Sequence, residues 1–179
     1  DEGLDEFFEI AADAGVNVVP SIIDAMPAGS MAAIIADPVT RTQHVETIRS
    51  FAAELAVAGI DIDYEQFAFA DGRDTWAATR PNWVAFIAEL GAALRGDDRT
   101  LAVSIPPVYD AGQTADSGYW VYDYGAIAPH VDRIRIMAYD FSVSKAGPIA
   151  PLNFVERSII GAIDATGDPE KLVLGLPAY

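Results

Sequence analysis

Three acidic side chains alternate with apolar ones in one short segment, Ala58-Gly-Ile-Asp-Ile-Asp-Tyr-Glu65. Successive side chains of a β-strand point to opposite faces. In a strand, Asp61, Asp63 and Glu65 therefore share one face, and the two isoleucines and the tyrosine share the other. Carboxyl groups this close together in a partly buried site cannot all ionise near neutral pH, so at least one should titrate high and serve as a general acid.

The order of the acids along the segment predicts a role for each of them. Glu65 stands where the predicted strand gives way to a loop, which is where α/β sheets and barrels carry their chemistry. We therefore predict that Glu65 is the proton donor to a leaving group. Asp63 lies one step inward on the same face, where it can orient a reacting group and exchange a proton with Asp61.

A solvated edge strand and a hard-cation site are the competing interpretations of these three acids. The flanking isoleucines favour a well-buried element over a solvated edge. The chain has two histidines, His44 and His130, and neither is paired at metal-ligand spacing. We expect both to be solvated residues or helix caps, and we expect no metal and no cofactor.

Amphipathic helices alternate with short β-branched runs along the chain. We expect helices at 1–14, 38–58, 81–96, 124–129 and 154–165, and strands at 16–23, 60–64, 101–105, 133–139 and 172–176. Asp37 is the expected N-cap of the second helix, and Pro81 is expected to open the third. Regular alternation of this kind predicts an α/β fold with a parallel sheet, either an open doubly wound sheet or part of a (β/α)8 barrel.

Composition narrows the classes of partner. The chain has 179 residues, of which 27 are acidic and 11 basic, giving a net charge of −16. This charge argues against nucleic acid or anionic lipid as a partner. The absence of cysteine excludes disulfides and a cysteine nucleophile. The most apolar stretch, 15–36, is interrupted by Asp24 and two prolines, so we expect no membrane span.

Three motifs resemble glycoside hydrolase family 18, the chitinase-like (β/α)8 barrels. The acidic segment is similar to the family's DGxDxDxE pattern on the fourth strand, Ile136-Met-Ala-Tyr-Asp140 to its MxYD segment on the sixth, and Lys171-Leu-Val-Leu-Gly-Leu-Pro-Ala-Tyr179 to its KxxLGxPxYG ending on the seventh. The run Gly147-Pro-Ile-Ala-Pro-Leu152 most resembles the branch with spore-germination and spore-lytic N-acetylglucosaminidases.

The resemblance implies a partial (β/α)8 TIM barrel of about five parallel strands with intervening helices. The strands would be the third to seventh of the barrel, so residues 1–179 would form an incomplete family 18 catalytic domain. Its open sheet edges would favour self-association. Ala58 replaces the first acid of the pattern, which in the family lies deep in the barrel and supports the proton relay from below.

The implied activity is hydrolysis of β-1,4-linked N-acetylglucosamine glycans, either chitin-type oligomers or peptidoglycan. The family mechanism is retaining and substrate-assisted. By this resemblance Glu65 protonates the glycosidic oxygen and then deprotonates water. Asp63 holds the acetamido N–H and stabilises the oxazolinium intermediate, Asp61 shares a proton with Asp63, and Tyr139 donates to the acetamido oxygen.

The resemblance also implies a sugar-binding site lined by Met137 and Asp140. Tyr109 is our candidate for a stacking platform, in a cluster that also contains Trp120, Tyr122 and Tyr124. Ordinary core packing is the alternative for each of these aromatic residues, and it is the role expected of Trp76 and Trp83.

Two alternatives to an active hydrolase remain open. One is a non-catalytic sugar-binding relative, and the other is a fragment too incomplete to be active. The retained acids and Tyr139 argue against the first. The resemblance implies that the protein is secreted or associated with the cell wall.

Overall fold

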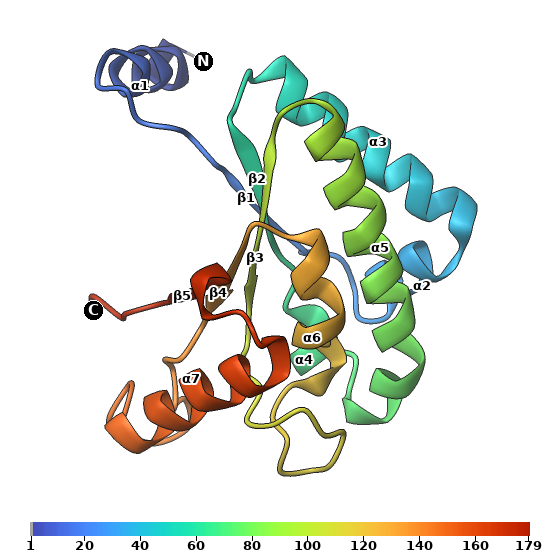
Figure 1. Ribbon diagram of the computed structural model, residues 1–179, viewed down its shortest axis with the longest axis vertical. Helices are drawn as coiled ribbons and strands as arrows, with labels where there is room; N and C mark the ends of the chain where they lie inside the picture. The colour runs from blue at the N-terminus through green and yellow to red at the C-terminus, as the bar shows by residue number, and fades with distance from the viewer. Residues whose placement is uncertain (1) are drawn as a thin grey trace.

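Five parallel strands form one sheet in the computed structural model, which describes residues 2–179 and their side chains from residue 3 onward. The sheet has the sequential order β1-β2-β3-β4-β5. Its strands are Ser21–Ile23, Gly59–Asp63, Thr100–Ile105, Arg133–Ile136 and Leu172–Leu174. The α/β architecture with adjacent parallel strands confirms the fold prediction, and the sheet is open, with β1 and β5 at its edges (Figure 1).

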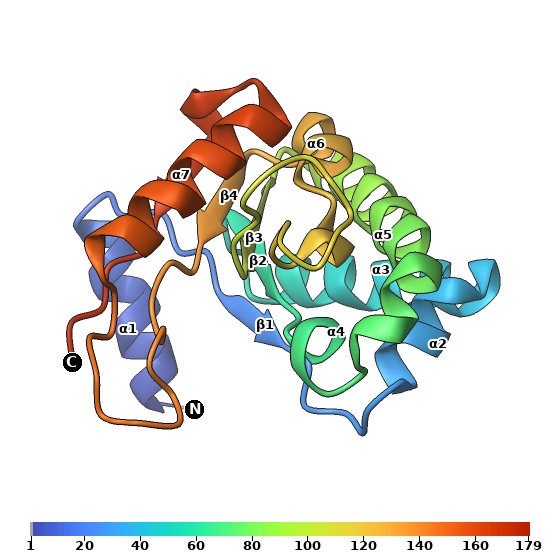
Figure 2. The ribbon, with the colours of Figure 1, turned by 90° about the horizontal axis from the view of Figure 1, so that it is seen from below.

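Helices connect every pair of neighbouring strands, and a further helix, α1 (Glu2–Asp13), precedes β1. The connecting helices are α2 (Ser30–Ala36), α3 (Pro38–Glu54), α4 (Gln66–Phe69), α5 (Trp76–Gly96), α6 (Tyr124–Ile127) and α7 (Leu152–Thr166). Short 3₁₀ turns lie at Arg73–Thr75, Trp120–Tyr122, Ala128–His130 and Pro169–Lys171. Helices α3 and α5 lie side by side against one face of the sheet, and α1 stands apart from this layer (Figures 1 and 2).

The core lies between the sheet and the α3–α5 layer. Ile60, Ile62 and Tyr64 are fully buried there, as the alternation along the acidic segment predicts. The two tryptophans of α5 are packing anchors, as expected. The indole N–H of Trp76 donates to the Phe67 carbonyl at 2.6 Å, and that of Trp83 donates to the Tyr122 carbonyl at 2.9 Å.

The start of α5 differs from the prediction. The helix begins at Trp76, so Pro81 lies inside it and does not open it. A proline inside a helix removes a backbone hydrogen bond and crowds the preceding turn. Burial of the Trp76 ring and its bond to Phe67 hold that first turn in place, and Asn82 donates from its side chain to the Ala78 carbonyl at 3.0 Å.

Several elements are shorter than predicted, and two short helices were missed. β1 contains only three residues, because Pro20 before it has no N–H to donate to a ladder. α3 ends at Glu54, before the left-handed Ala56 at φ 52°. Strand β4 stops at Ile136 and β5 at Leu174, while α2 and α4 lay in segments with no predicted helix. The predicted cap of α3 is confirmed, since Asp37 accepts from Val39 and Thr40.

His44 on α3 is not the solvated residue that its position predicted. Its Nε2 lies 2.8 Å from the Tyr64 hydroxyl, and its ring stacks on those of Tyr64 and Phe86. Burial lowers the pKa of His44, opposed by the charge of Asp24. The imidazole is thus a packing element behind the acidic strand.

This burial of His44 should make stability depend on pH. Because its pKa is lowered on folding, the unfolded chain binds a proton at higher pH than the folded chain does. The neutral ring therefore contributes stability above its unfolded pKa of about 6.5 that is lost as the pH falls through that value. We expect the parent to lose more stability than a His44→Gln variant between about pH 8 and pH 5.

Urea unfolding midpoints of the parent and His44→Gln, measured across this pH range, give this difference. Both proteins retain Asp63 and Glu65, so the titration of these two carboxyls is common to both curves. His130→Gln, the same substitution at the other histidine of the sequence, serves as the matched control. Equal pH dependence in the parent and His44→Gln would contradict the prediction.

Across the described residues 2–179, no helix combines the length and the hydropathy needed to cross a membrane. Apolar side chains are exposed on both edge strands of the sheet, including Ile23 on β1 and Val173 on β5. Self-association through these edges stays a prediction.

Candidate active site

The three acids lie on one face of β2 and beyond its end, flanked by β1 and β3. In the ladder, Asp61 is paired with Ser21 on one side and Ala102 on the other, and Asp63 with Ile23. At the start of β2, Gly59 is paired with Thr100 of β3. A side chain at this position would not fit, because a Cβ there would lie 2.5 Å from the Thr100 carbonyl oxygen. Figure 2 views the molecule from the carboxyl end of the strands, where Glu65 precedes α4.

Asp61 is the deepest of the three acids, with 1% of its surface exposed. Its Oδ2 accepts from the Ser21 hydroxyl at 2.6 Å and from the Ser104 hydroxyl at 2.8 Å. The Arg135 guanidinium lies 3.1 Å from the same oxygen. The buried carboxyl group of Asp61 is thus held by groups from three other strands, β1, β3 and β4.

Asp63 and Glu65 lie nearer the surface and are only half-buried. Burial raises the pKa of Asp63 to about 6, with the negative charges of Glu65 and Asp61 acting in the same direction. Burial also raises the pKa of Glu65, assisted by the charge of Asp140. The structure therefore supports the expectation that these carboxyls titrate high, which suits proton transfer near neutral pH.

A cleft of about 500 Å³ opens beside Glu65 at this end of the sheet. Five of the seven residues predicted for the site line it: Glu65, Tyr109, Met137, Tyr139 and Asp140. Asp61 and Asp63 do not line the cleft. Asp63 is linked to it electrostatically, because the charge of Glu65 raises the pKa of Asp63. The structure thus brings the sequence-derived residues to one place.

Tyr139 and Asp140 follow β4 and face the acids of β2. Burial raises the pKa of Tyr139, and the charges of Asp63 and Glu65 raise it further. Gly175 after β5 makes room for the Tyr139 ring, since a Cβ there would lie 2.8 Å from its Cε1 atom. Asp140 adopts a left-handed backbone at φ 54° and accepts from the Tyr179 hydroxyl at 2.6 Å.

The aromatic residues of the cleft were only partly predicted. Tyr109 lines it, with the Arg157 guanidinium 4.2 Å from its ring centre. Tyr122 and Tyr124 are fully buried core residues, and Trp120 packs against Trp76, so these three have the packing role that was the alternative to a stacking platform. The aromatic residues missed by sequence reasoning are Phe69, Tyr119, Phe141 and Phe154.

Arg135 is the other functional candidate that sequence reasoning missed. The alternation that places Met137 and Tyr139 on one face of the fourth predicted strand places Arg135 there too. A cation in a run of isoleucines, on the face that meets the acids, was the signal available.

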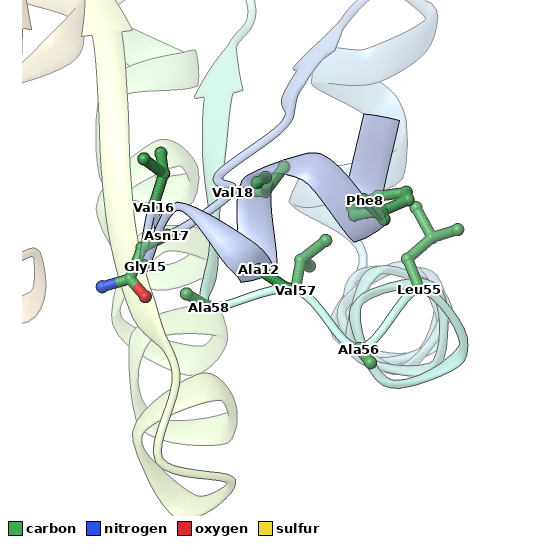
Figure 3. A pocket seen from close by; sticks show the side chains of 11 residues that line it. Phe8, Ala12, Gly15, Val16, Asn17, Val18, Leu55, Ala56, Val57 and Ala58 are labelled. Atoms are coloured by element: carbon green, nitrogen blue, oxygen red, sulfur yellow. The ribbon is translucent and has the colours of Figure 1, made fainter. Parts of the chain in front are cut away.

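A second hollow, of about 420 Å³, lies at the opposite end of the sheet. Figure 3 shows its lining side chains, which come from α1 and the segment after it and from the turn between α3 and β2. Ala58 is among them, and none of them is ionisable. Over the described part of the chain, no group of three or more His, Cys, Asp or Glu could hold a metal ion, so the hard-cation interpretation gains no support.

A parallel α/β sheet with a cleft lined by acidic and aromatic residues at its carboxyl end is the arrangement in which enzymes of the (β/α)8-barrel class carry their active sites. The chain belongs to the family described as glycosyl hydrolases family 18, whose profile matches residues 4–179.

Individual relatives agree with this assignment. The chain is 30% identical over 150 residues to the putative sporulation-specific glycosylase YdhD of Bacillus subtilis, covering 82% of this chain and 32% of that protein. It is 32% identical over 198 residues to a chitinase-like effector of Moniliophthora roreri, covering 99% of this chain and 46% of that one. The chain thus spans a third to a half of the length of these curated relatives.

A solved structure supports the fold. The class V chitinase of Pseudomonas fluorescens Pf-5 superposes with a TM-score of 0.83 at 22% identity, over 100% of this chain and 55% of that one.

Proposed function

We propose that this chain carries the catalytic acids of a retaining β-N-acetylglucosaminide hydrolase acting on chitin-type oligomers or peptidoglycan. The observation that carries the proposal is the arrangement of Glu65 and Tyr139 on one cleft with Asp63 directly behind Glu65 on β2. Membership of family 18 supports the same chemistry. Substrates of this kind lie outside the cytoplasm, so the proposal includes a secreted or wall-associated location.

Glu65 is the proposed acid and base of the reaction. In the first step its proton passes to the glycosidic oxygen as the bond to the anomeric carbon breaks, while the substrate's own acetamido oxygen bonds to that carbon. In the second step Glu65 takes a proton from water as the water oxygen bonds to the anomeric carbon. The bond from the acetamido oxygen to that carbon breaks, which opens the oxazolinium ring and restores the acetamido group. The pKa of Glu65, raised by burial, supports its protonated form at the start.

Asp63 and Tyr139 are the proposed partners of the acetamido group. The Oδ1 atom of Asp63 is buried and has no hydrogen-bond partner among the described residues, which suits an acceptor for the acetamido N–H. The Tyr139 hydroxyl would donate to the acetamido oxygen from the opposite side of the cleft. Together they would hold that oxygen against the anomeric carbon.

Two chromogenic substrates test this proposal in the full-length protein. We expect release of the chromophore from a di-N-acetylchitobioside, and release from the matching cellobioside reduced by about a hundredfold or more, because the cellobioside lacks the attacking acetamido group. Early product should have the β configuration by proton NMR. Equal rates on both substrates, or an α product, would contradict substrate assistance, and binding without cleavage would favour the non-catalytic relative.

A further inference from the structure

The polar network beneath the cleft depends on one cation from β4. Arg135 projects from that strand to the buried Asp61, with Nη1 3.1 Å from Oδ2. It is the charged partner that the structure gives this carboxylate within residues 2–179. The other two groups on the same oxygen are the neutral hydroxyls of Ser21 and Ser104.

The contacts give Asp61 and Asp63 different partners. All three partners of Asp61 lie on Oδ2, and its Oδ1 is buried without a hydrogen-bond partner. Asp63 has a similar unpartnered atom, its own Oδ1, and no cation is bonded to it in the described chain. A buried charge without a cation would be strongly destabilised, so the guanidinium decides which of the two acids is compensated.

We propose that Arg135 is a positioning residue that compensates the charge of Asp61 and thereby allows Asp63, the second acid of the pair, to release its proton. The inference rests on the proposed function, because it assigns Arg135 a part in preparing Asp63 for the acetamido group. The charge of the pair is then set from β4, which lies two strands away from β2 in the sheet.

Other charged or titratable groups also face Asp63, and they define the background for a test. From its own strand and the following turn these are Asp61 and Glu65, and from the segment after β4 Tyr139, whose pKa Asp63 raises. Tyr122, fully buried beneath the site, also senses the charges of Glu65 and Asp63. β1 and β3 contribute the neutral serines described above. All of these groups remain when Arg135 alone is replaced.

Titration of Asp63 in Arg135→Met tests the proposal in the full-length protein. Carbon-13 NMR of labelled aspartate, with the signal assigned through Asp63→Asn, measures it without turnover. Loss of the guanidinium leaves the charge of Asp61 uncompensated, so Asp63 should keep its proton to a pH about one unit higher than in the parent. The acidic limb of kcat/KM should move in the same direction, and Arg135→Lys should restore much of the parental behaviour.

Arg133→Met is the matched control, because Arg133 lies on the same strand, is exposed and donates to the Asp132 carbonyl. It should leave the Asp63 titration unchanged. An unchanged titration in folded Arg135→Met, or an equal shift in Arg133→Met, would overturn the proposal. If Asp63 titrates as in the parent while Arg135→Met has normal turnover, only the role of Arg135 is refuted. If the shift occurs but the parent protein itself shows no turnover, the proposed activity is refuted.

A second measurement applies where Arg135→Met does not fold. Asp61 is buried, whereas the Arg135 side chain is 38% exposed, so the cost of losing the guanidinium falls on the buried carboxylate that it leaves without a cation. Removing the cation alone is therefore destabilising, but replacing both partners is often tolerated. The double variant Asp61→Asn with Arg135→Met should therefore recover the thermal transition that the single variant lost. A double variant no more stable than Arg135→Met would overturn the assigned pair.

Discussion

Glu65→Gln should reduce turnover of an N-acetylglucosaminide by about a thousandfold, because general acid catalysis contributes about 10²–10⁴ to a rate. The amide fills the same space and can still donate a hydrogen bond, but it cannot release a proton to the leaving group. Binding of oligosaccharide should remain within a few-fold of the parent value. The measurement is kcat on a chromogenic chitobioside together with calorimetric binding in the full-length protein.

Glu54→Gln provides the control for this substitution. Glu54 is exposed at the end of α3 and lies outside the cleft lining, so the same chemical change there should leave kcat unaltered. Turnover by Glu65→Gln within tenfold of the parent would remove Glu65 from the role of proton donor.

Asp63→Asn should reduce turnover by about a hundredfold or more, since it removes a charge that would stabilise the oxazolinium. The same change should stabilise the fold at neutral pH. The pKa of Asp63 is raised to about 6 on folding, so the carboxyl favours the folded state below its unfolded pKa and loses that contribution as the pH rises through both values. The asparagine has no charge to desolvate.

The gain in stability is modest because Asp63 is half-exposed and partly screened by solvent. After that discount we expect about 1 kcal/mol at pH 7.5, which raises Tm by about 2–4 °C. Below about pH 4 the advantage should disappear, because the parent carboxyl is then protonated in both states. Thermal unfolding of parent and variant at the two pH values measures it, and a Tm difference independent of pH would contradict the assignment.

Local patterns in the sequence predicted the acidic face well, for a physical reason. Side-chain direction in a strand follows from its period of two alone, so Asp61 and Glu65 could be placed on one face without any knowledge of neighbouring strands. The strand before Tyr139 was predicted from its β-branched run, although β4 ends at Ile136 and Tyr139 lies in the segment after it. Both predictions depend only on residues adjacent in the chain.

Partners from different elements could not be predicted in this way. The pairing of Arg135 with Asp61 depends on the register between β2, β3 and β4, which no local pattern encodes. The contact of His44 with Tyr64 depends on how α3 lies on the sheet. The start of α5 was misplaced because a tertiary contact of Trp76 overrides the local preference of Pro81.

The network around Asp61 joins four adjacent strands, with one residue each from β1, β2, β3 and β4. Sliding any one of them by a single residue would turn its polar side chain to the opposite face. Misaligned sheets would then bury an acid or an arginine without its partner, at a high energetic penalty. The polar network beneath the cleft thus also favours the correct strand register during folding. Only in that register does each polar side chain of the network meet its partner.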